Sequence, residues 1–258
     1  MNVAHIQAEV KGIIGREIFF YDTVGSTNTV ASEQSEKTSE GAVVLADSQE
    51  RGRGRLGRSW ISPAGVNIHM SVILRPKMEI RHATLITIMA AVACAAALRK
   101  TTGLDVSIKW PNDLTVSGRK LGGILTDLKT EKGAIVAAIV GIGINVNSDT
   151  DAFPGEVNKI ATSVKKETGN LASREKVIIA ILLEMDKWYT ILQGVHSNML
   201  LSEWKRLTST LGKKVAVTLG EETLNGVAED IDDEGRLLLK LPSGEIKRIS
   251  SGDLTVLR

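Results

Sequence analysis

The chain has 258 residues, with 32 basic and 30 acidic side chains and a formal net charge of +2. This near balance argues against a nonspecific nucleic-acid binder, which carries a wide basic surface. The single cysteine, Cys94, excludes an internal disulfide and a cysteine-based zinc site. Because Cys94 lies in an alanine-rich apolar run, we expect a packed core thiol rather than a nucleophile, which is consistent with a reducing cytoplasm.

The N-terminal third is predicted to contain three strands and one polar helix. The first eleven residues include Glu9 and lack the apolar run of a signal peptide. Apolar and alternating patterns predict strands over residues 18–22, 42–46 and 66–74. Ser26, Thr27 or Asn28 is placed to cap a helix over residues 29–37. Between the second and third strands, residues 49–59 hold three glycines and four arginines without periodicity, which predicts a loop.

The middle of the chain is predicted to contain a buried helix, four strands and two more helices. The apolar run 83–98 is shorter than the roughly 20 residues that span a bilayer, so it predicts a buried helix over 82–101 that ends at Gly103. Ser173 is the expected N-cap of the next helix. The predicted strands are residues 106–109, 114–116, 120–128 and 135–146, and the later helices are residues 173–193 and 197–207.

The last fifty residues differ in character from the rest. Short strands joined by glycine-containing turns predict a small β-barrel. The predicted strands are residues 215–219, 223–231, 236–241, 246–249 and 254–257. We therefore expect a large domain over residues 1–208 and a small one over residues 209–258.

The strongest chemical signal is the segment Arg51–Trp60, in which arginines alternate with glycines. Glycines let backbone N–H groups approach a ligand, and arginines offer forked donors to carboxylate or phosphate. The segment therefore predicts a loop that folds around an anion, although a solvated basic loop or a weak nucleic-acid patch has the same composition. The chain lacks the Gly-x4-Gly-Lys-Ser/Thr motif of a P-loop ATPase.

Three further segments combine glycine, lysine and amide side chains. Lys109–Asp113 suits phosphate and magnesium but is also a good turn. Arg119–Leu125 places a lysine before two glycines, which permits either a ligand against the strand or a bulge. Gly141–Asn147 lacks the third glycine of a dinucleotide fingerprint and fits a strand whose glycine face touches a ligand.

Two other groups of polar residues have simpler interpretations. The histidines have no metal-ligand spacing, so we expect them to be solvated or packed; they are His5, His69, His82 and His196. The run Asp232–Gly235 lacks the spacing of a calcium loop and predicts a turn between strands.

Taken together, these motifs resemble the biotin protein ligase family, in the family's order and at similar spacing over residues 18–257. The resemblance implies an α+β fold, a mixed β-sheet with helices packed on it as in class II aminoacyl-tRNA synthetases, followed by a C-terminal SH3-like β-barrel. The motifs that carry it are Gly25-Ser26-Thr27-Asn28, Gln49, Gly52-Arg53-Gly54-Arg55-x-Gly57-Arg58-x-Trp60, Ser62-Pro63-x-Gly65, Lys109-Trp110-Pro111-Asn112-Asp113, Arg119-Lys120-Leu121-x-Gly123-Ile124-Leu125 and Gly141-x-Gly143-x-Asn145.

The resemblance also implies roles for individual residues. Expected to act in catalysis are Lys120, Arg55 and Lys109. Expected around biotin are Ser26, Thr27, Asn28, Gln49, Gly52, Arg53, Gly54, Arg55, Lys120, Gly123, Gly141 and Gly143. Expected around ATP are Arg55, Arg58, Trp60, Lys109, Asn112, Lys120 and Asn145, with Asp113 as a magnesium ligand.

The implied reaction forms biotinyl-5′-adenylate from biotin and ATP and then transfers biotin to a lysine of a biotin carboxyl carrier protein. Its first step needs no base, because a carboxylate with a pKa near ~4 is already a nucleophile at neutral pH. Only 17 residues precede the first predicted strand, so we expect no DNA-binding repressor module. We also expect a cytoplasmic enzyme that binds no DNA and no membrane.

Two alternatives and the oligomeric state stay open at this point. A lipoate or octanoate protein ligase has a similar fold, but its ligand lacks the ureido group that Ser26, Thr27 and Gln49 suit. A nucleic-acid-binding module fits less well with the near-neutral charge. For the oligomeric state, a homodimer is one option.

Overall fold

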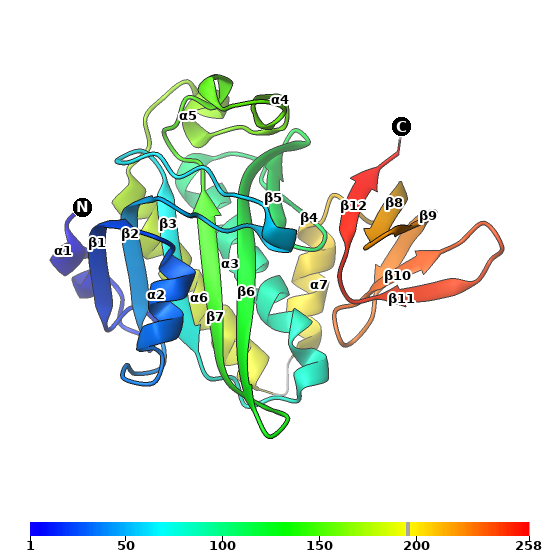
Figure 1. Ribbon diagram of the computed structural model, residues 1–258, viewed down its shortest axis with the longest axis horizontal. Coiled ribbons are helices and arrows are strands. Elements are labelled where there is room, and N and C mark those ends of the chain that lie inside the picture. Colours follow the sequence, from blue (N-terminus) through cyan, green and yellow to red (C-terminus); the bar gives the residue numbers. More distant parts are fainter. Residues whose placement is uncertain (195–196, 258) are drawn as a thin grey trace.

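A computed structural model describes residues 1–194 and 197–257, and its largest element is a seven-stranded mixed sheet (Figure 1). The strand order is β1-β2-β3-β7-β6-β5-β4, in which β1 and β2 are parallel and the other neighbours are antiparallel. The strands are β1 Ile18–Val24, β2 Val43–Gln49, β3 Ile68–Leu74, β4 Ser107–Lys109, β5 Asp113–Val116, β6 Arg119–Glu131 and β7 Ala134–Ile144.

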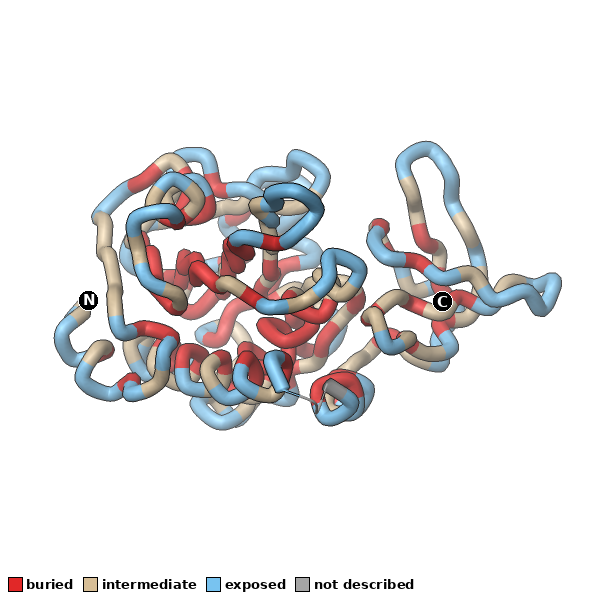
Figure 2. The backbone as a smooth tube through the Cα atoms, turned by 90° about the horizontal axis from the view of Figure 1, so that it is seen from below, coloured by how far each residue is buried: buried red, intermediate tan, exposed pale blue. Residues whose placement is uncertain are grey.

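One face of this sheet is covered by helices, because alternate strand residues are apolar and buried. Met70 and Val72 of β3 and Val140 and Ile142 of β7 belong to the main core cluster. The covering helices are α3 Thr84–Thr102, α6 Arg174–Gln193 and α7 Ser197–Leu207, and Figure 2 shows the buried backbone concentrated between them and the sheet. The opposite face is covered only in part, by α2 Thr27–Gln34, which packs against β2, β3 and β7.

Helix α3 is the apolar helix expected from the sequence. By length and composition the stretch Ile80–Thr102 could cross a membrane, and no other helix of the described ranges meets that test. Its α3 part is a core helix, since residues such as Ile88 and Leu98 are fully buried against α6 and the sheet. Cys94 is completely buried there, which raises the pKa of its thiol and confirms the expected packed residue.

Most predicted strands and long helices are present, with shifted ends. The predicted helix 29–37 is α2 Thr27–Gln34, which begins earlier because Ser26 occupies the N-cap position without a side-chain capping bond. Ser173 caps α6 by accepting a hydrogen bond from the Lys176 N–H, as predicted. Three short helices were missed, α1 Val3–Glu9, α4 Val157–Ile160 and α5 Val164–Thr168. His196 lies outside the described residues.

The C-terminal strands form a separate antiparallel sheet in the order β11-β10-β9-β8-β12, consistent with the expected SH3-like region (Figure 1). Its strands are β8 Lys214–Leu219, β9 Glu222–Ile231, β10 Leu237–Lys240, β11 Ile246–Ile249 and β12 Asp253–Val256. The connecting segment is tied to the large sheet, since Thr210 Oγ1 accepts a hydrogen bond from the Trp110 N–H at 2.9 Å. Asp232 forms the predicted turn by accepting from the Arg236 N–H. The division at residues 208 and 209 stays a prediction.

His69 is packed inside the protein, on the face of β3 that is turned away from the long helices. It is 1% exposed, and burial lowers its pKa to about 4. The unfolded chain would bind a proton near pH 6.5, so protonation favours unfolding between these two values.

We predict that the free energy of unfolding decreases as the pH falls from about 6.5 to about 4, by up to about 3 kcal/mol from His69 alone. Replacing His69 by Leu should flatten this pH dependence, measured by urea unfolding at pH 7 and pH 4.5. His5→Gln is the control, because His5 is exposed. An unchanged pH dependence in the His69 variant would contradict this account of the buried imidazole.

Candidate active site

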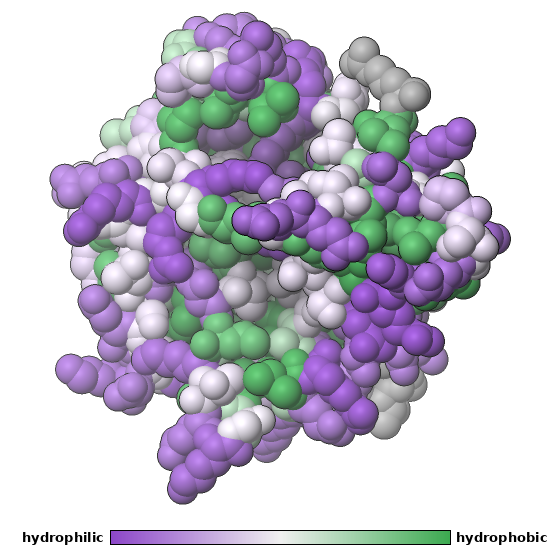
Figure 3. Space-filling model, turned by 45° about the vertical axis from the view of Figure 1, so that its right-hand side comes forward, coloured by the Kyte–Doolittle hydropathy of each residue, from purple (hydrophilic) through white to green (hydrophobic). Residues whose placement is uncertain are grey.

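A pocket of about 350 Å³ lies on the sheet face opposite the long helices, and Figure 3 shows this side of the molecule hollowed near its centre. It is bordered by the sheet, by the arginine loop (residues 51–60) and by the start of β12. The sequence-predicted residues that line it are Ser26, Thr27, Asn28, Gln49, Arg53, Gly54, Arg55, Arg58, Trp60, Lys109, Asn112, Asp113, Lys120, Gly123, Gly141, Gly143 and Asn145. Gly52 instead borders a second, shallower hollow on the outer side of the loop.

Glycines form the floor of the pocket. Gly141 and Gly143 lie two residues apart on β7 and therefore face the same side of the sheet. A Cβ added to Gly143 would lie 2.5 Å from the ring of Trp60, and one added to Gly141 would overlap the amide of Asn28. The sheet therefore accepts these two side chains directly on its backbone only because both positions are glycine.

One end of the pocket is neutral and polar. Gln49 accepts a hydrogen bond from the Thr27 N–H at 2.9 Å and donates from Nε2 to Ser62 Oγ at 2.9 Å, which fixes the orientation of its amide. Ser26, Thr27 and Asn28 are each only 4% exposed, so this end is largely removed from water before a ligand arrives. Neutral donors and acceptors in such a setting suit an uncharged polar group.

Lys120 carries the positive charge nearest to the glycine floor. Its Nζ is 2.5 Å from Asp113 Oδ1 and 5.7 Å from the ring centroid of Trp60. It also lies against Gly123, where an added Cβ would be 3.5 Å from Nζ. The ammonium is thus held between a carboxylate and an aromatic ring, beside Gly123, which is the strand neighbour of Gly143.

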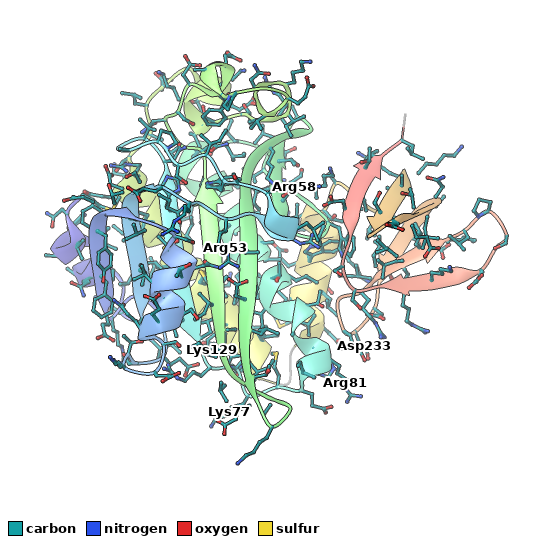
Figure 4. The ribbon with its side chains drawn as sticks, in the orientation of Figure 1. Arg53, Arg58, Lys77, Arg81, Lys129 and Asp233 are labelled. Atoms are coloured by element: carbon teal, nitrogen blue, oxygen red, sulfur yellow. The ribbon has the colours of Figure 1, made fainter. Side chains whose placement is uncertain are left out.

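The arginine loop crosses the pocket as a short hairpin. The Trp60 N–H donates to the Gly52 carbonyl at 2.9 Å, the Gly54 N–H donates to the Arg58 carbonyl at 2.7 Å, and the tip is a 3-10 turn, η1 Arg55–Gly57. The predicted loop is therefore more ordered than its composition indicates. Arg53 pairs with Asp127 and Arg58 with Asp253, and Figure 4 shows the Arg53 and Arg58 side chains pointing to different sides.

Two of these arginines connect the loop to the C-terminal sheet. Arg55 donates to Asn112 Oδ1 at 3.2 Å and to the Gly252 carbonyl at 3.3 Å. Arg58 forms an ion pair with Asp253. Burial lowers the pKa of Arg55, and the nearby carboxylates of Asp253 and Asp113 oppose this effect.

Part of the pocket lining comes from distant segments that the sequence did not predict. Asp253, Leu254 and Thr255 enter from β12, and Phe153, Val157 and Ile160 enter from the segment around α4. The predicted residue Asn145 lines the pocket, but its amide is used within the fold, where it donates to the Thr162 carbonyl at 3.1 Å. No local motif marks the β12 residues.

The carboxylates of the pocket lining suit a metal ion only when a phosphorylated ligand supplies further oxygen ligands. Over residues 1–194 and 197–257, no group of three His, Cys, Asp or Glu side chains could hold a metal ion. The acidic residues of the pocket lining are Asp113 and Asp253. Because Mg²⁺ commonly uses one or two carboxylates together with substrate phosphates, Asp113 fits that mode.

The mixed sheet with this pocket, followed by the small C-terminal sheet, defines the class of biotin and lipoate ligases. Residues 20–145 match the model of the Biotin/lipoate A/B protein ligase family, and residues 210–254 match the Biotin protein ligase C terminal domain. Both matches agree with the two sheets of the structure.

Individual relatives show which family of this class the chain is most similar to. The chain is 38% identical to the Bifunctional ligase/repressor BirA of Bacillus spizizenii, over 94% of this chain and 74% of the relative. It is 34% identical to the Biotin--[acetyl-CoA-carboxylase] ligase of Paracoccus denitrificans, over 85% of this chain and 92% of the relative. Among solved structures, it resembles the biotin protein ligase from Aquifex aeolicus in complex with biotin and ATP, with a TM-score of 0.80, 28% identity and coverage of 94% and 99%. The chain belongs to the biotin protein ligase family and is a ligase.

We predict that Gly143→Ala displaces the ring of Trp60 from the sheet, because the new methyl group would overlap it. Acrylamide quenching should then detect one more accessible tryptophan than in the unchanged protein. Gly194→Ala is the control, since an added Cβ there has its nearest neighbour at 3.5 Å. Equal quenching in Gly143→Ala and the unchanged protein would show that the ring does not rest on Gly143.

Proposed function

We propose that this chain joins biotin to ATP to form biotinyl-5′-adenylate and then transfers biotin to a lysine of a biotin carboxyl carrier protein. The observation that carries the proposal is one pocket with a neutral polar end at Thr27 and Gln49 and a cationic end at Lys120 and Arg55. The neutral end suits the ureido ring of biotin, and the cationic end suits the carboxylate and the phosphates.

In the first step, a carboxylate oxygen of biotin attacks the α-phosphorus of ATP, the new O–P bond forms, and pyrophosphate leaves. Two anions must approach each other, so the site has to supply positive charge rather than a base. Lys120 would bridge the carboxylate and the α-phosphate, while Arg55, Arg58 and Lys109 would hold the phosphates. Trp60 would pack on adenine, and Asn112 and Asn145 would complete the nucleotide end.

The ion pair between Lys120 and Asp113 has a direct consequence for this step. Mg²⁺ bound with ATP would offset phosphate charge, and Asp113 is the carboxylate that would hold it. In this structure Asp113 pairs with Lys120, the ammonium that would contact the substrate anions. Pairing the lysine beforehand avoids an uncompensated charge in a half-buried site.

In the second step, the ε-amine of the acceptor lysine attacks the acyl carbon of the adenylate. The amide bond forms, the bond to the phosphate oxygen breaks, AMP leaves, and the amine loses a proton. The proposed acceptor is the carrier domain of a carboxylase such as acetyl-CoA carboxylase.

The experiment that tests the proposed function is transfer of biotin to a purified biotin carrier domain, followed by avidin blotting. Labelling should require ATP, and lipoate should not replace biotin. Transfer of lipoate or octanoate at a comparable rate, with no transfer of biotin, would contradict the proposal and favour a lipoate-type ligase.

Lys120→Ala should lower the rate of adenylate formation by at least about 100-fold, the scale for removing one major electrostatic contact. The measurement is biotin-dependent pyrophosphate release. Lys129→Ala is the matched control, because Lys129 lies on the same strand and pairs with the exposed Glu36. Near-normal release by the Lys120 variant would assign the role to another cation, with Lys109 the next candidate.

Arg55→Gly should loosen the arginine loop, because it removes the contacts to Asn112 and Gly252. We expect the variant to form adenylate but release it early, so that it labels lysines of a bystander protein. Leu56→Gly controls for added backbone freedom, since Leu56 is 70% exposed and already has a positive φ of 53°. Equal bystander labelling by the Arg55 variant and the unchanged enzyme would show that the arginine loop does not hold the adenylate in the pocket.

A further inference from the structure

Asp127 is an acidic residue on the pocket side of β6 that belongs to none of the sequence motifs. It follows Gly123 and Leu125 at alternate positions, so all three face the same side of the sheet. Its carboxylate accepts a hydrogen bond from Asn28 Nδ2 at 2.9 Å and lies 3.5 Å from Arg53 Nη1. Asp127 therefore contacts two residues expected around biotin from a position just outside the pocket lining.

The contact with Asp127 fixes the orientation of the Asn28 amide. Asn28 Nδ2 also donates to the Leu125 carbonyl at 3.2 Å, so both acceptors on the β6 side face its NH2 group. A carboxylate and a carbonyl can only accept, so the reversed amide would place oxygen against oxygen. Asn28 Oδ1 must then point the other way, where it lies 2.6 Å from Ser71 Oγ.

This orientation determines where the hydroxyl protons go. Ser71 Oγ lies 2.6 Å from Asn28 Oδ1 and 2.8 Å from Thr27 Oγ1, and it has one proton to donate. Because Asn28 Oδ1 can only accept, Ser71 donates to it. The contact between Ser71 and Thr27 is then satisfied when Thr27 donates its own proton to Ser71.

This assignment of the hydroxyl protons leaves two acceptors at the neutral end of the pocket available to a ligand. Thr27 Oγ1 has one proton and two neighbouring acceptors, Ser71 Oγ at 2.8 Å and Gln49 Oε1 at 3.2 Å, and we assign the proton to the shorter contact. Gln49 Oε1 then keeps only the Thr27 N–H as a donor, so it has a lone pair for a ligand. Thr27 Oγ1, having given its proton away, likewise presents lone pairs.

We propose that Asp127 is a positioning residue that sets the direction of these hydrogen bonds, so that Thr27 and Gln49 present acceptors to the N–H groups of the ligand. The inference rests on the proposed function, since the ureido ring of biotin carries two N–H donors. The dithiolane of lipoate carries none, so Asp127 contributes to the choice between the two acids.

The test compares the binding of biotin, desthiobiotin and ATP by calorimetry. Asp127→Leu removes the acceptor and leaves Asn28 free to turn, so the dissociation constants of biotin and desthiobiotin should both rise about tenfold, the scale for a lost buried hydrogen-bond arrangement. That of ATP should change less than about twofold. Asp127→Asn keeps an acceptor oxygen for Asn28 and should retain most of the affinity. Glu131→Leu, at the exposed end of the same strand, is the control.

Two further measurements distinguish this positioning role from an effect of the Arg53–Asp127 ion pair and from misfolding of the Asp127→Leu variant. The pair between Arg53 and Asp127 is partly exposed, with side chains 51% and 36% accessible, so about 1 M salt would screen it. Biotin affinity of the unchanged protein should therefore persist at high salt. Ser71→Ala removes the hydroxyl that links Asn28 to Thr27, so it should weaken biotin binding but not ATP binding. This variant tests the proposal even if Asp127→Leu does not fold.

Normal biotin affinity in Asp127→Leu or in Ser71→Ala would overturn the proposal, as would an equal loss in Asp127→Asn and Asp127→Leu. Loss of biotin binding by the unchanged protein at high salt would assign the effect to the ion pair. Failure of the unchanged protein to bind biotin in any buffer would instead contradict the proposed function itself.

Discussion

The direct contact of side chains with the bare backbone of β7 is the constraint on which the site depends. Because Gly141 and Gly143 carry no side chain, Asn28 and Trp60 lie on the sheet itself, and a pocket exists where strand residues would otherwise fill the space. The other face of the sheet is covered by α3, on which α6 packs. The glycines thus determine both the depth of the pocket and the neighbours of the ligand.

Several cations of this pocket are paired before any ligand binds. Lys120 is paired with Asp113, Arg58 with Asp253 and Arg53 with Asp127, whereas Arg55 donates to the neutral oxygens of Asn112 and Gly252. An unpaired ammonium or guanidinium in a half-buried site would lose hydration without compensation. In the proposed reaction, substrate anions would take the place of these carboxylates, so few charges would be left without a partner.

The sequence predicted much of the fold and the site, for physical reasons that also explain what it missed. Strand alternation and glycine turns are local, so they identified the strands and the floor residues Gly141 and Gly143. The contacts of Asn28 with Asp127 and of Arg58 with Asp253 join residues 99 and 195 positions apart, and nothing local marks such pairs. One signal for Asp127 was present: it shares the two-residue alternation of Gly123, so a carboxylate on the glycine face of β6 was predictable once β6 was assigned as a strand.

We propose that the neutral and cationic ends of one pocket hold a biotin carboxylate against the α-phosphate of ATP. Exchange of labelled pyrophosphate into ATP tests this arrangement, since exchange requires reversible adenylate formation but no carrier protein. We expect exchange that depends on biotin and is not supported by lipoate. Exchange without biotin, or equal exchange with lipoate, would contradict the proposed arrangement.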